Sequence, residues 1–307
     1  MSLNNISEKQ IKNGRFAVLL AAILWGTTGT VASFAPQLSP LAIGAFAMGI
    51  GGLLQAMIAR KKLISDIDKL LTVKRELLIG ALAVAIYPLA FYTAMQFSGI
   101  TIGTVISIAT APFATVLLER LLSKKNHMDR RWQVSVGLGV IGVVLLTYSE
   151  GMSAQYDQQN ALKFIGALLG LLAGLTYAIY SWVARSLIEK GIQSESAMGS
   201  LFALGAAILI PSLFFTGENL FSNLNNILVV SYMALVPMFI GYLAFGFGLR
   251  YVHASRATLL TLFEPVVAAV LAVSVVGEHI AFSGWLGMLL IITCLFLQTR
   301  AKSTTVI

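Results

Sequence analysis

The sequence predicts an all-α integral membrane protein with ten transmembrane helices, arranged as two inverted five-helix repeats. Three observations lead to this prediction: a composition suited to lipid, ten long apolar segments, and a motif pattern that occurs twice. Of the 307 residues, 57% are hydrophobic and 11% are charged, whereas a typical soluble domain has about 25% charged residues. The mean hydropathy is +0.84. Because so few polar side chains are present to cover the apolar surface, lipid must be the solvent for most of the chain.

Ten apolar segments are long enough to span a bilayer, which takes about 20 residues as a helix. Within a few residues at each end, they are 16–35, 40–59, 77–97, 101–121, 133–149, 163–183, 197–215, 227–249, 256–276 and 284–299. The first follows Lys9, Lys12 and Arg15. Its apolar run is longer than the core of a signal peptide, so we expect it to be retained as a spanning helix. The connections leave no room for a soluble domain.

The positive charges alternate with these segments. Short cytoplasmic loops of membrane proteins are rich in Lys and Arg. If the N-terminus is cytoplasmic, all but Lys163 of the 21 Lys and Arg residues fall on the cytoplasmic side. This distribution predicts an inner-membrane protein with both termini in the cytoplasm. It also explains the net charge of +8 as a topology signal, so we do not expect binding to nucleic acid.

The two halves of the chain repeat one pattern. Four prolines occupy corresponding positions near the middle of their segments and are expected to kink the helices: Pro88, Pro112, Pro237 and Pro265. The predicted repeats cover 16–149 and 163–300. Because each half has an odd number of segments, the second must be inserted upside down relative to the first. Inverted repeats are typical of secondary transporters, which bind their solute near the membrane midplane between the repeats.

Short motifs in both halves resemble the drug/metabolite transporter superfamily, EamA type. They are ILWGTTG at 23–29, AP and the apolar run after it at 111–118, FEPVVAAVLAVSVVGE at 263–278 and GWLGMLLIITCLFL at 284–297. The resemblance covers residues 16–300. It implies a ten-helix secondary transporter, often a bacterial exporter of amino acids or other small metabolites. One departure is that Lys124-Lys125 stand where the second repeat has Gly277-Glu278.

A single carboxylate, Glu264, lies near the middle of the ninth segment, directly before Pro265. Acids at this depth in a membrane usually face a cavity and have a function. Thr258 and Thr261 precede it by six and three residues, which places all three on one helix face. Pro265 deprives the Thr261 carbonyl of its helical donor, and a protonated Glu264 could replace that donor. Glu264 is therefore a candidate for substrate or proton coupling; the alternative is a permanently neutral acid that ties the helix together.

Several aromatic and hydroxyl side chains fall deep within other segments. Tyr and Trp commonly lie at the membrane interface, so deeper positions indicate a pocket. The candidates for substrate binding are Trp25, Thr28, Tyr87, Tyr92, Gln96, Ser107, Tyr177, Tyr180 and Tyr242. For Ser107 the alternative is a bond back to its own helix. Such a lining suits an amphipathic organic solute with an apolar body and a few polar groups.

Two further features concern the edges of the segments and their packing. Glu119 and Arg120 end the fourth segment and are expected to be solvated helix-end charges or, alternatively, part of a gate. Gly166, Gly170 and Gly174 have consecutive GxxxG spacing, which lets helix backbones approach closely. We expect this stripe to pack within the monomer; the oligomeric state stays open.

The expected function is secondary transport of a small organic metabolite, such as an amino acid, by alternating access, with export favoured. Its partners would be the small-molecule substrate, the lipid bilayer and, as candidate coupling ions, protons. A broad-specificity drug or amine efflux protein is the alternative, followed by a membrane-embedded enzyme. Walker A, HExxH and GxSxG sequences are absent, so catalysis has little support. No cofactor or metal is expected, because the one cysteine and three histidines show no ligand spacing.

Overall fold

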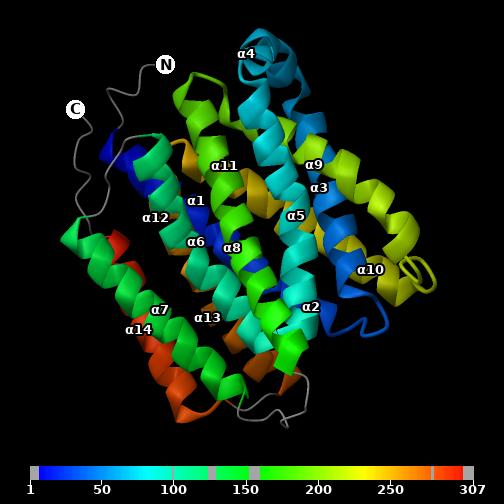
Figure 1. Ribbon diagram of the computed structural model, residues 1–307, viewed down its shortest axis with the longest axis vertical. Helices are drawn as coiled ribbons and strands as arrows, with labels where there is room; N and C mark the ends of the chain where they lie inside the picture. The colour runs from blue at the N-terminus through cyan, green and yellow to red at the C-terminus, as the bar shows by residue number, and fades with distance from the viewer. Residues whose placement is uncertain (1–6, 99, 124–128, 152–159, 278–279, 300–307) are drawn as a thin grey trace.

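The computed structural model describes residues 7–98, 100–123, 129–151, 160–277 and 280–299, and the regular elements in these ranges are helices (Figure 1). The first half contains α1 (Glu8–Gly26), α2 (Thr28–Ala32), α3 (Pro40–Ser65), α4 (Ile67–Thr72), α5 (Lys74–Ser98), α6 (Ile100–Leu122) and α7 (Arg130–Gly151). The second contains α8 (Asn160–Glu189), α9 (Ser194–Thr216), α10 (Leu224–Met233), the π-helix η2 (Ala234–Gly241), α11 (Tyr242–Leu249), α12 (Ala254–Leu260), the 3₁₀-helix η3 (Thr261–Phe263), α13 (Glu264–Leu271), the π-helix η4 (Ala272–Val276) and α14 (Phe282–Thr299).

Within the described ranges, seven helical stretches are long and apolar enough to cross a membrane. They are Glu8–Ala32, Pro40–Ser65, Lys74–Ser98, Leu162–Glu189, Ser194–Thr216, Leu224–Leu249 and Ala254–Val276. A shorter apolar helix covers Phe282–Gln298, and α6 and α7 occupy the predicted fourth and fifth segments. The chain is therefore a multi-pass membrane protein.

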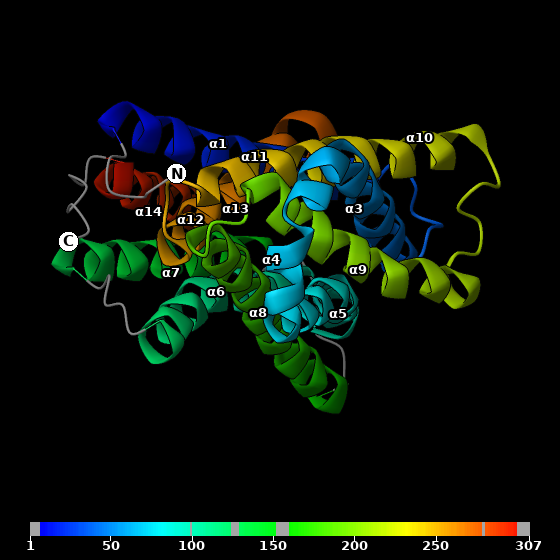
Figure 2. The same ribbon diagram turned by 90° about the horizontal axis from the view of Figure 1, so that it is seen from above.

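The two halves interleave instead of forming separate domains. The α3 helix packs on α9, and α7 packs on α14, so equivalent helices of the two halves pair with each other. In addition, α5 packs on α8, and α1 packs on α11. In the predicted repeat α1 corresponds to α8 and α5 corresponds to α11, so these two contacts are equivalent. Figure 2 shows α7 and α14 at one side of the bundle and α3, α9 and α10 at the other. This pairing fits an inverted repeat, with its two-fold axis passing through the bundle.

The glycine stripe of α8 brings that helix close to its neighbours. A Cβ atom at Gly174 would lie 2.5 Å from the carbonyl oxygen of Ser107, and one at Gly166 would lie 2.6 Å from the backbone nitrogen of Ser98. Gly170 faces α6 in the same way, with 3.4 Å to the Gly103 carbonyl oxygen. The expected close packing within the monomer is confirmed, and it holds α8 against the helices that line the centre of the bundle.

The four prolines have different effects on their helices. Pro237 lies inside the π-helix η2, and Pro265 lies in the first turn of α13, directly after the 3₁₀ turn η3. Pro88 and Pro112, in contrast, lie inside helices that stay α throughout. A change of helix type therefore occurs at two of the four predicted kinks. A membrane helix can continue through proline, because neighbouring groups satisfy the backbone group that proline leaves unbonded.

The connection that contains α4 packs against the connection between α8 and α9. The Lys62 ammonium lies 2.5 Å from the Glu195 carboxylate, and Asp66 accepts a hydrogen bond from the Gln193 backbone N–H at 2.9 Å. Burial alone would raise the pKa of Asp66, but hydrogen bonds from Gln193 and Lys69 outweigh it and hold that pKa below its ordinary value. Both connections are predicted to be cytoplasmic, and the structure places them side by side.

Candidate functional site

A cavity lies between helices of both halves, near the middle of the bundle. It is lined by Trp25, Thr28, Gly44, Met48, Tyr87, Pro88, Phe91, Tyr92, Ile108, Tyr177, Tyr180, Met238, Tyr242, Thr261 and Glu264. Nine of the twelve predicted site residues are in this lining. The centres of water molecules could occupy about 30 Å³ of the cavity, which is room for one or two waters. Because a metabolite needs more space, the cavity must widen when a solute binds.

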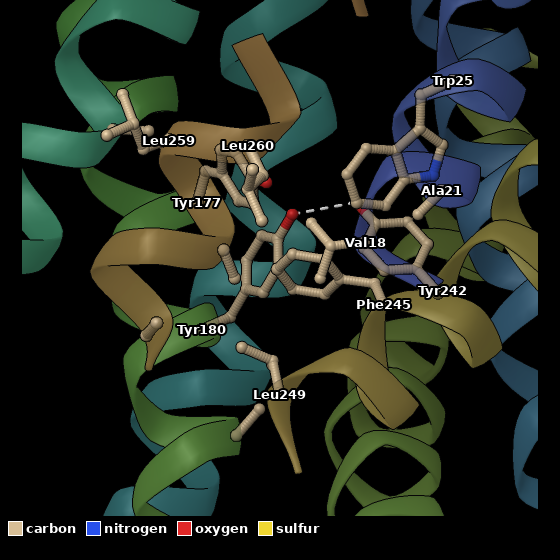
Figure 3. Packing of buried hydrophobic residues seen from close by; sticks show 14 of the residues in the cluster. Val18, Ala21, Trp25, Tyr177, Tyr180, Tyr242, Phe245, Leu249, Leu259 and Leu260 are labelled. Carbon is tan, nitrogen blue, oxygen red and sulfur yellow. Dashed lines mark hydrogen bonds between the residues drawn. The ribbon is translucent and has the colours of Figure 1, made fainter. Parts of the chain in front are cut away.

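Trp25 connects α1 to the second half of the protein (Figure 3). Its indole N–H donates a buried hydrogen bond of 2.9 Å to the carbonyl oxygen of Pro237. Its ring lies 4.7 Å from that of Tyr242 and 5.3 Å from that of Phe245, between centroids. Gly241 makes room for the indole, since a Cβ atom there would lie 2.8 Å from the Trp25 Nε1 atom. Trp25 is thus a wall of the cavity and a contact between the repeats.

Tyrosine hydroxyls bond across the cavity. The hydroxyls of Tyr180 and Tyr242 lie 2.8 Å apart (Figure 3), and the Tyr177 hydroxyl lies 2.9 Å from Thr261 Oγ1. The ring of Tyr87 lies 5.8 Å from those of both Tyr177 and Tyr180. Tyr180 and Tyr242 are only 1% and 3% exposed, so their bond lies inside the bundle.

Glu264 is the first residue of α13 and is half-buried. Its carboxylate has no hydrogen bond or ion pair with any residue that the structure describes. The carbonyl of Thr261 accepts a hydrogen bond from the Glu264 backbone N–H, because the chain tightens into a 3₁₀ turn before Pro265. This carbonyl thus already has a backbone donor, and the structure shows no bond from the Glu264 side chain to it. A Cβ atom at Gly26 would lie 2.8 Å from the Glu264 carbonyl oxygen, so α1 passes directly beside the acid.

Three predicted site residues lie outside the lining. Thr258 donates to the carbonyl of Ala254 at 3.1 Å, and Ser107 donates to that of Gly103 at 2.7 Å. Both hydroxyls thus bond to their own helices, as Ser and Thr commonly do. Gln96 is exposed, near the end of α5. The structure does not place these three side chains in the lining of the cavity.

The lining also contains apolar residues that the sequence did not single out. Phe91, Met48, Met238 and Ile108 contribute side chains. Gly44 contributes space, since a Cβ atom there would lie 2.5 Å from the Tyr92 ring. No signal could have separated these residues from the many other apolar residues in the spans.

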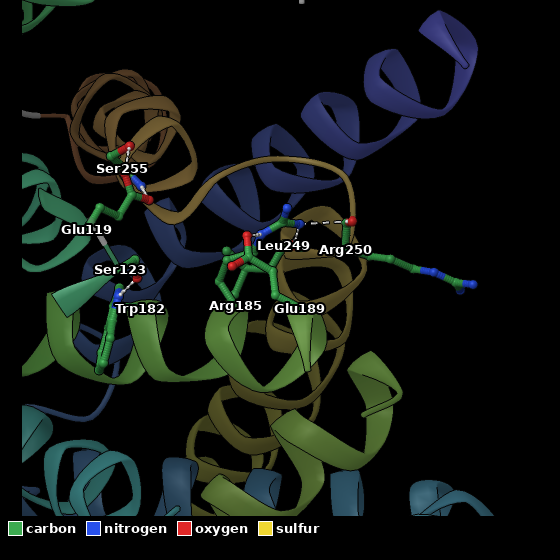
Figure 4. Close-up of polar contacts among 8 residues, drawn as sticks. All are labelled: Glu119, Ser123, Trp182, Arg185, Glu189, Leu249, Arg250 and Ser255. Carbon is green, nitrogen blue, oxygen red and sulfur yellow. Dashed lines mark hydrogen bonds and ion pairs between the residues drawn. The ribbon is translucent and has the colours of Figure 1, made fainter. Parts of the chain in front are cut away.

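A second polar network lies at the end of α8 that adjoins α4, and its centre is Arg185 (Figure 4). The Arg185 Nη1 atom donates to the carbonyl oxygens of Leu249 and Arg250, at 2.6 and 3.0 Å. Its Nε atom donates to the Glu189 carboxylate at 2.9 Å. The side chain is only 8% exposed. The last carbonyl groups of a helix have no hydrogen-bond donor within that helix. Arg185 therefore supplies the donor for two such carbonyls at the end of α11.

Glu119 extends this network from α6 to α12. Its carboxylate accepts hydrogen bonds from the Ser255 hydroxyl at 2.6 Å and from the Ser255 backbone N–H at 3.0 Å (Figure 4). Glu119 is only 5% exposed, so the expectation of a solvated charge is wrong for it, although Arg120 is exposed. The acid binds an unsatisfied N–H in the first turn of a helix, which is a favourable place for a carboxylate. Together, Glu119 and Arg185 tie four helices at this end.

The described residues contain no group of three or more His, Cys, Asp or Glu side chains that could hold a metal ion. The polar and aromatic groups that line the central cavity are one carboxylate, the rings of Trp, Tyr and Phe, and hydroxyls. Such groups bind and orient a solute through charge, ring faces and hydrogen bonds.

Interleaved membrane helices around a polar and aromatic cavity are the architecture of a membrane transporter. The chain belongs to the EamA-like transporter family, whose model matches it twice, over residues 12–148 and 164–300. The uncharacterized transporter YwfM of Bacillus subtilis is 32% identical over 288 residues, 92% of this chain and 93% of that protein. The uncharacterized inner membrane transporter YedA of Escherichia coli K12 is 27% identical over 197 residues, 64% of this chain and 60% of that one. A solved crystal structure shares the fold, with a TM-score of 0.75 and 16% identity over 92% of this chain and 95% of the other.

Proposed function

We propose that the protein is a secondary transporter of the inner membrane that moves a small amphipathic organic metabolite, of the amino acid or amine class, by alternating access. In this proposal the ten predicted segments form two inverted repeats, at 16–149 and 163–300, and both termini are cytoplasmic. One observation carries the proposal: a central cavity, built by both halves, holds the unpartnered carboxylate of Glu264. The family resemblance favours export as the direction.

The contacts around the cavity support closure at one end. Toward the α4 end, the Tyr180–Tyr242 bond is followed by the buried side chains of Phe245 and Leu249 and then by Arg185. The other residues of the lining include Thr28, Tyr92 and Glu264, which are partly exposed. Alternating access requires the α4 end to open when the solute is exchanged on that side. Arg185 and Glu119 are the groups whose bonds would break.

We expect Gly44→Val to reduce solute flux at least tenfold, because the added atoms would fill the cavity beside Tyr92. Uptake of a panel of radiolabelled amino acids and organic amines into proteoliposomes measures this effect. Gly29→Val is the matched control, since a Cβ atom at Gly29 meets nothing within 4 Å, and it should retain wild-type flux. Wild-type flux in Gly44→Val, or no uptake of any panel member by the wild-type protein, would contradict the proposal.

We propose that Glu264 also couples transport to protons. In proteoliposomes, flux of the transported solute should increase when a pH gradient is imposed, and Glu264→Gln should remove that increase because glutamine cannot exchange a proton. Elution of the purified variant as a single peak in size-exclusion chromatography, with a wild-type thermal unfolding midpoint, is the control for folding. If Glu264→Gln retains pH-driven flux at the full rate, the coupling role is wrong.

A further inference from the structure

The charge of the central cavity limits which solutes it can hold. Glu264 is the one acid in the lining, and the described lining residues include no Lys, Arg or His. The Glu264 carboxylate also has no ion-pair or hydrogen-bond partner among the residues that the structure describes. A charge away from water is costly unless an opposite charge or hydrogen bonds compensate it. A cation in the cavity would compensate this carboxylate, and no residue of the described lining supplies one.

The aromatic lining points to the same kind of solute. Faces of Trp and Tyr rings attract cations that lie within about 6 Å of the ring centroid. Trp25 and Tyr242 lie 4.7 Å apart and Tyr177 and Tyr180 lie 5.3 Å apart, measured between ring centroids. These rings and Glu264 line one cavity, so a cation there would meet both a carboxylate and electron-rich faces.

A solute with its own carboxylate would fit less well. Its anionic group would have no cationic side chain to bind in the described lining, and it would lie in the same small cavity as Glu264. The hydroxyls that could bind an anion are partly engaged, because Tyr180 bonds to Tyr242 and Tyr177 bonds to Thr261. The described lining therefore favours a simple cation over an anion or a zwitterion, because it contains a carboxylate and no cationic side chain.

We propose that the solute of this cavity is a small organic cation, an ammonium group carried on an apolar body. Its charge pairs with Glu264, and its apolar part packs on the rings of Trp25, Tyr87 and Tyr177. This assignment rests on the proposed transport function and specifies its substrate class.

The test compares four ligands that share one phenyl body and differ in charge. Phenethylammonium is a cation, phenylalanine a zwitterion, 3-phenylpropionate an anion and 2-phenylethanol neutral. Each is titrated against the purified protein in detergent, and binding is measured from the concentration dependence of thermal stabilisation. We expect phenethylammonium to bind at least tenfold more tightly than the other three.

Glu264→Gln should weaken phenethylammonium binding at least tenfold and leave 2-phenylethanol binding unchanged, which also shows that the variant is folded. Glu218→Gln, an exposed acid outside the cavity, should bind all four ligands like the wild type. Equal or tighter binding of phenylalanine or 3-phenylpropionate, or full affinity of Glu264→Gln for phenethylammonium, would overturn the assignment. The transport proposal is judged separately by Gly44→Val flux. A non-cationic solute that this variant blocks would refute the cation assignment and leave transport intact.

Discussion

Trp25→Ala is expected to lower the free energy of unfolding by about 3–5 kcal/mol and to abolish transport. The indole is 6% exposed and lies in the contact between α1 and the second half. Its removal leaves a cavity among Tyr242, Phe245 and Tyr177. It also leaves the Pro237 carbonyl without its donor, which costs a further ~1–3 kcal/mol if no water replaces it.

Denaturant unfolding of the purified protein, combined with proteoliposome flux, measures both effects. Trp285→Ala is the matched control, because that indole is 54% exposed on the outer surface of the bundle and its loss should change stability little. Trp25→Phe should recover most of the packing but not the bond to Pro237. Equal stability of the Trp25→Ala and Trp285→Ala variants would show that the contact between α1 and the second half is not formed as described.

Arg185→Gln is expected to shift the protein toward the form that is open at the α4 end, by at least tenfold. Arg185 makes three hydrogen bonds, to Leu249, Arg250 and Glu189, and each bond from a charged group is worth about 1.5–3 kcal/mol. The two bonds to the Leu249 and Arg250 carbonyls join α8 to the end of α11, and in the proposed transport cycle they break when this end opens. Because about 1.4 kcal/mol corresponds to a tenfold change in an equilibrium, the loss of one bond is sufficient.

A single introduced cysteine can report this shift. The native Cys294 is buried and is replaced by alanine, and Thr261→Cys places a thiol in the cavity lining. A membrane-impermeant maleimide added to the cytoplasmic face should label this thiol at least tenfold faster in Arg185→Gln. Arg120→Gln removes an exposed charge at the same end of the helices and should leave the rate unchanged. Equal rates in the two variants would contradict the closing role of Arg185.

Much of the fold could be predicted from the sequence, because a bilayer permits few structures for a segment that spans it. Spanning segments must be long, apolar and helical, and the alternation of Lys and Arg restricts their number. Deep aromatic residues were equally informative, because Trp25, Tyr87 and Tyr177 lie too far from the ends of their segments to belong to an interface. The structure places all three around the cavity. The motif ILWGTTG also has a physical basis, since its Gly26 lets α1 touch the backbone beside Glu264.

The remainder depends on contacts between residues that are distant in the sequence. Glu119 and Ser255 are 136 positions apart, so nothing local distinguishes this buried acid from a solvated one at a helix end. Thr258 was expected to share a helix face with Glu264, but six residues already place the two about 120° apart around an ideal α-helix, and the 3₁₀ turn at Thr261–Phe263 changes the register between them further. Ser107 carries no local sign of whether its hydroxyl faces a cavity or its own backbone.

The most direct test of alternating access is the labelling of Thr261→Cys, in the Cys294→Ala background, from each side of the membrane. Right-side-out and inside-out vesicles are treated with a membrane-impermeant maleimide, with and without phenethylammonium. We expect labelling from both sides in the absence of solute, slower labelling from the closed cytoplasmic side, and faster labelling from that side when Arg185 is replaced by glutamine. Labelling from only one side under every condition, including Arg185→Gln, would contradict alternating access.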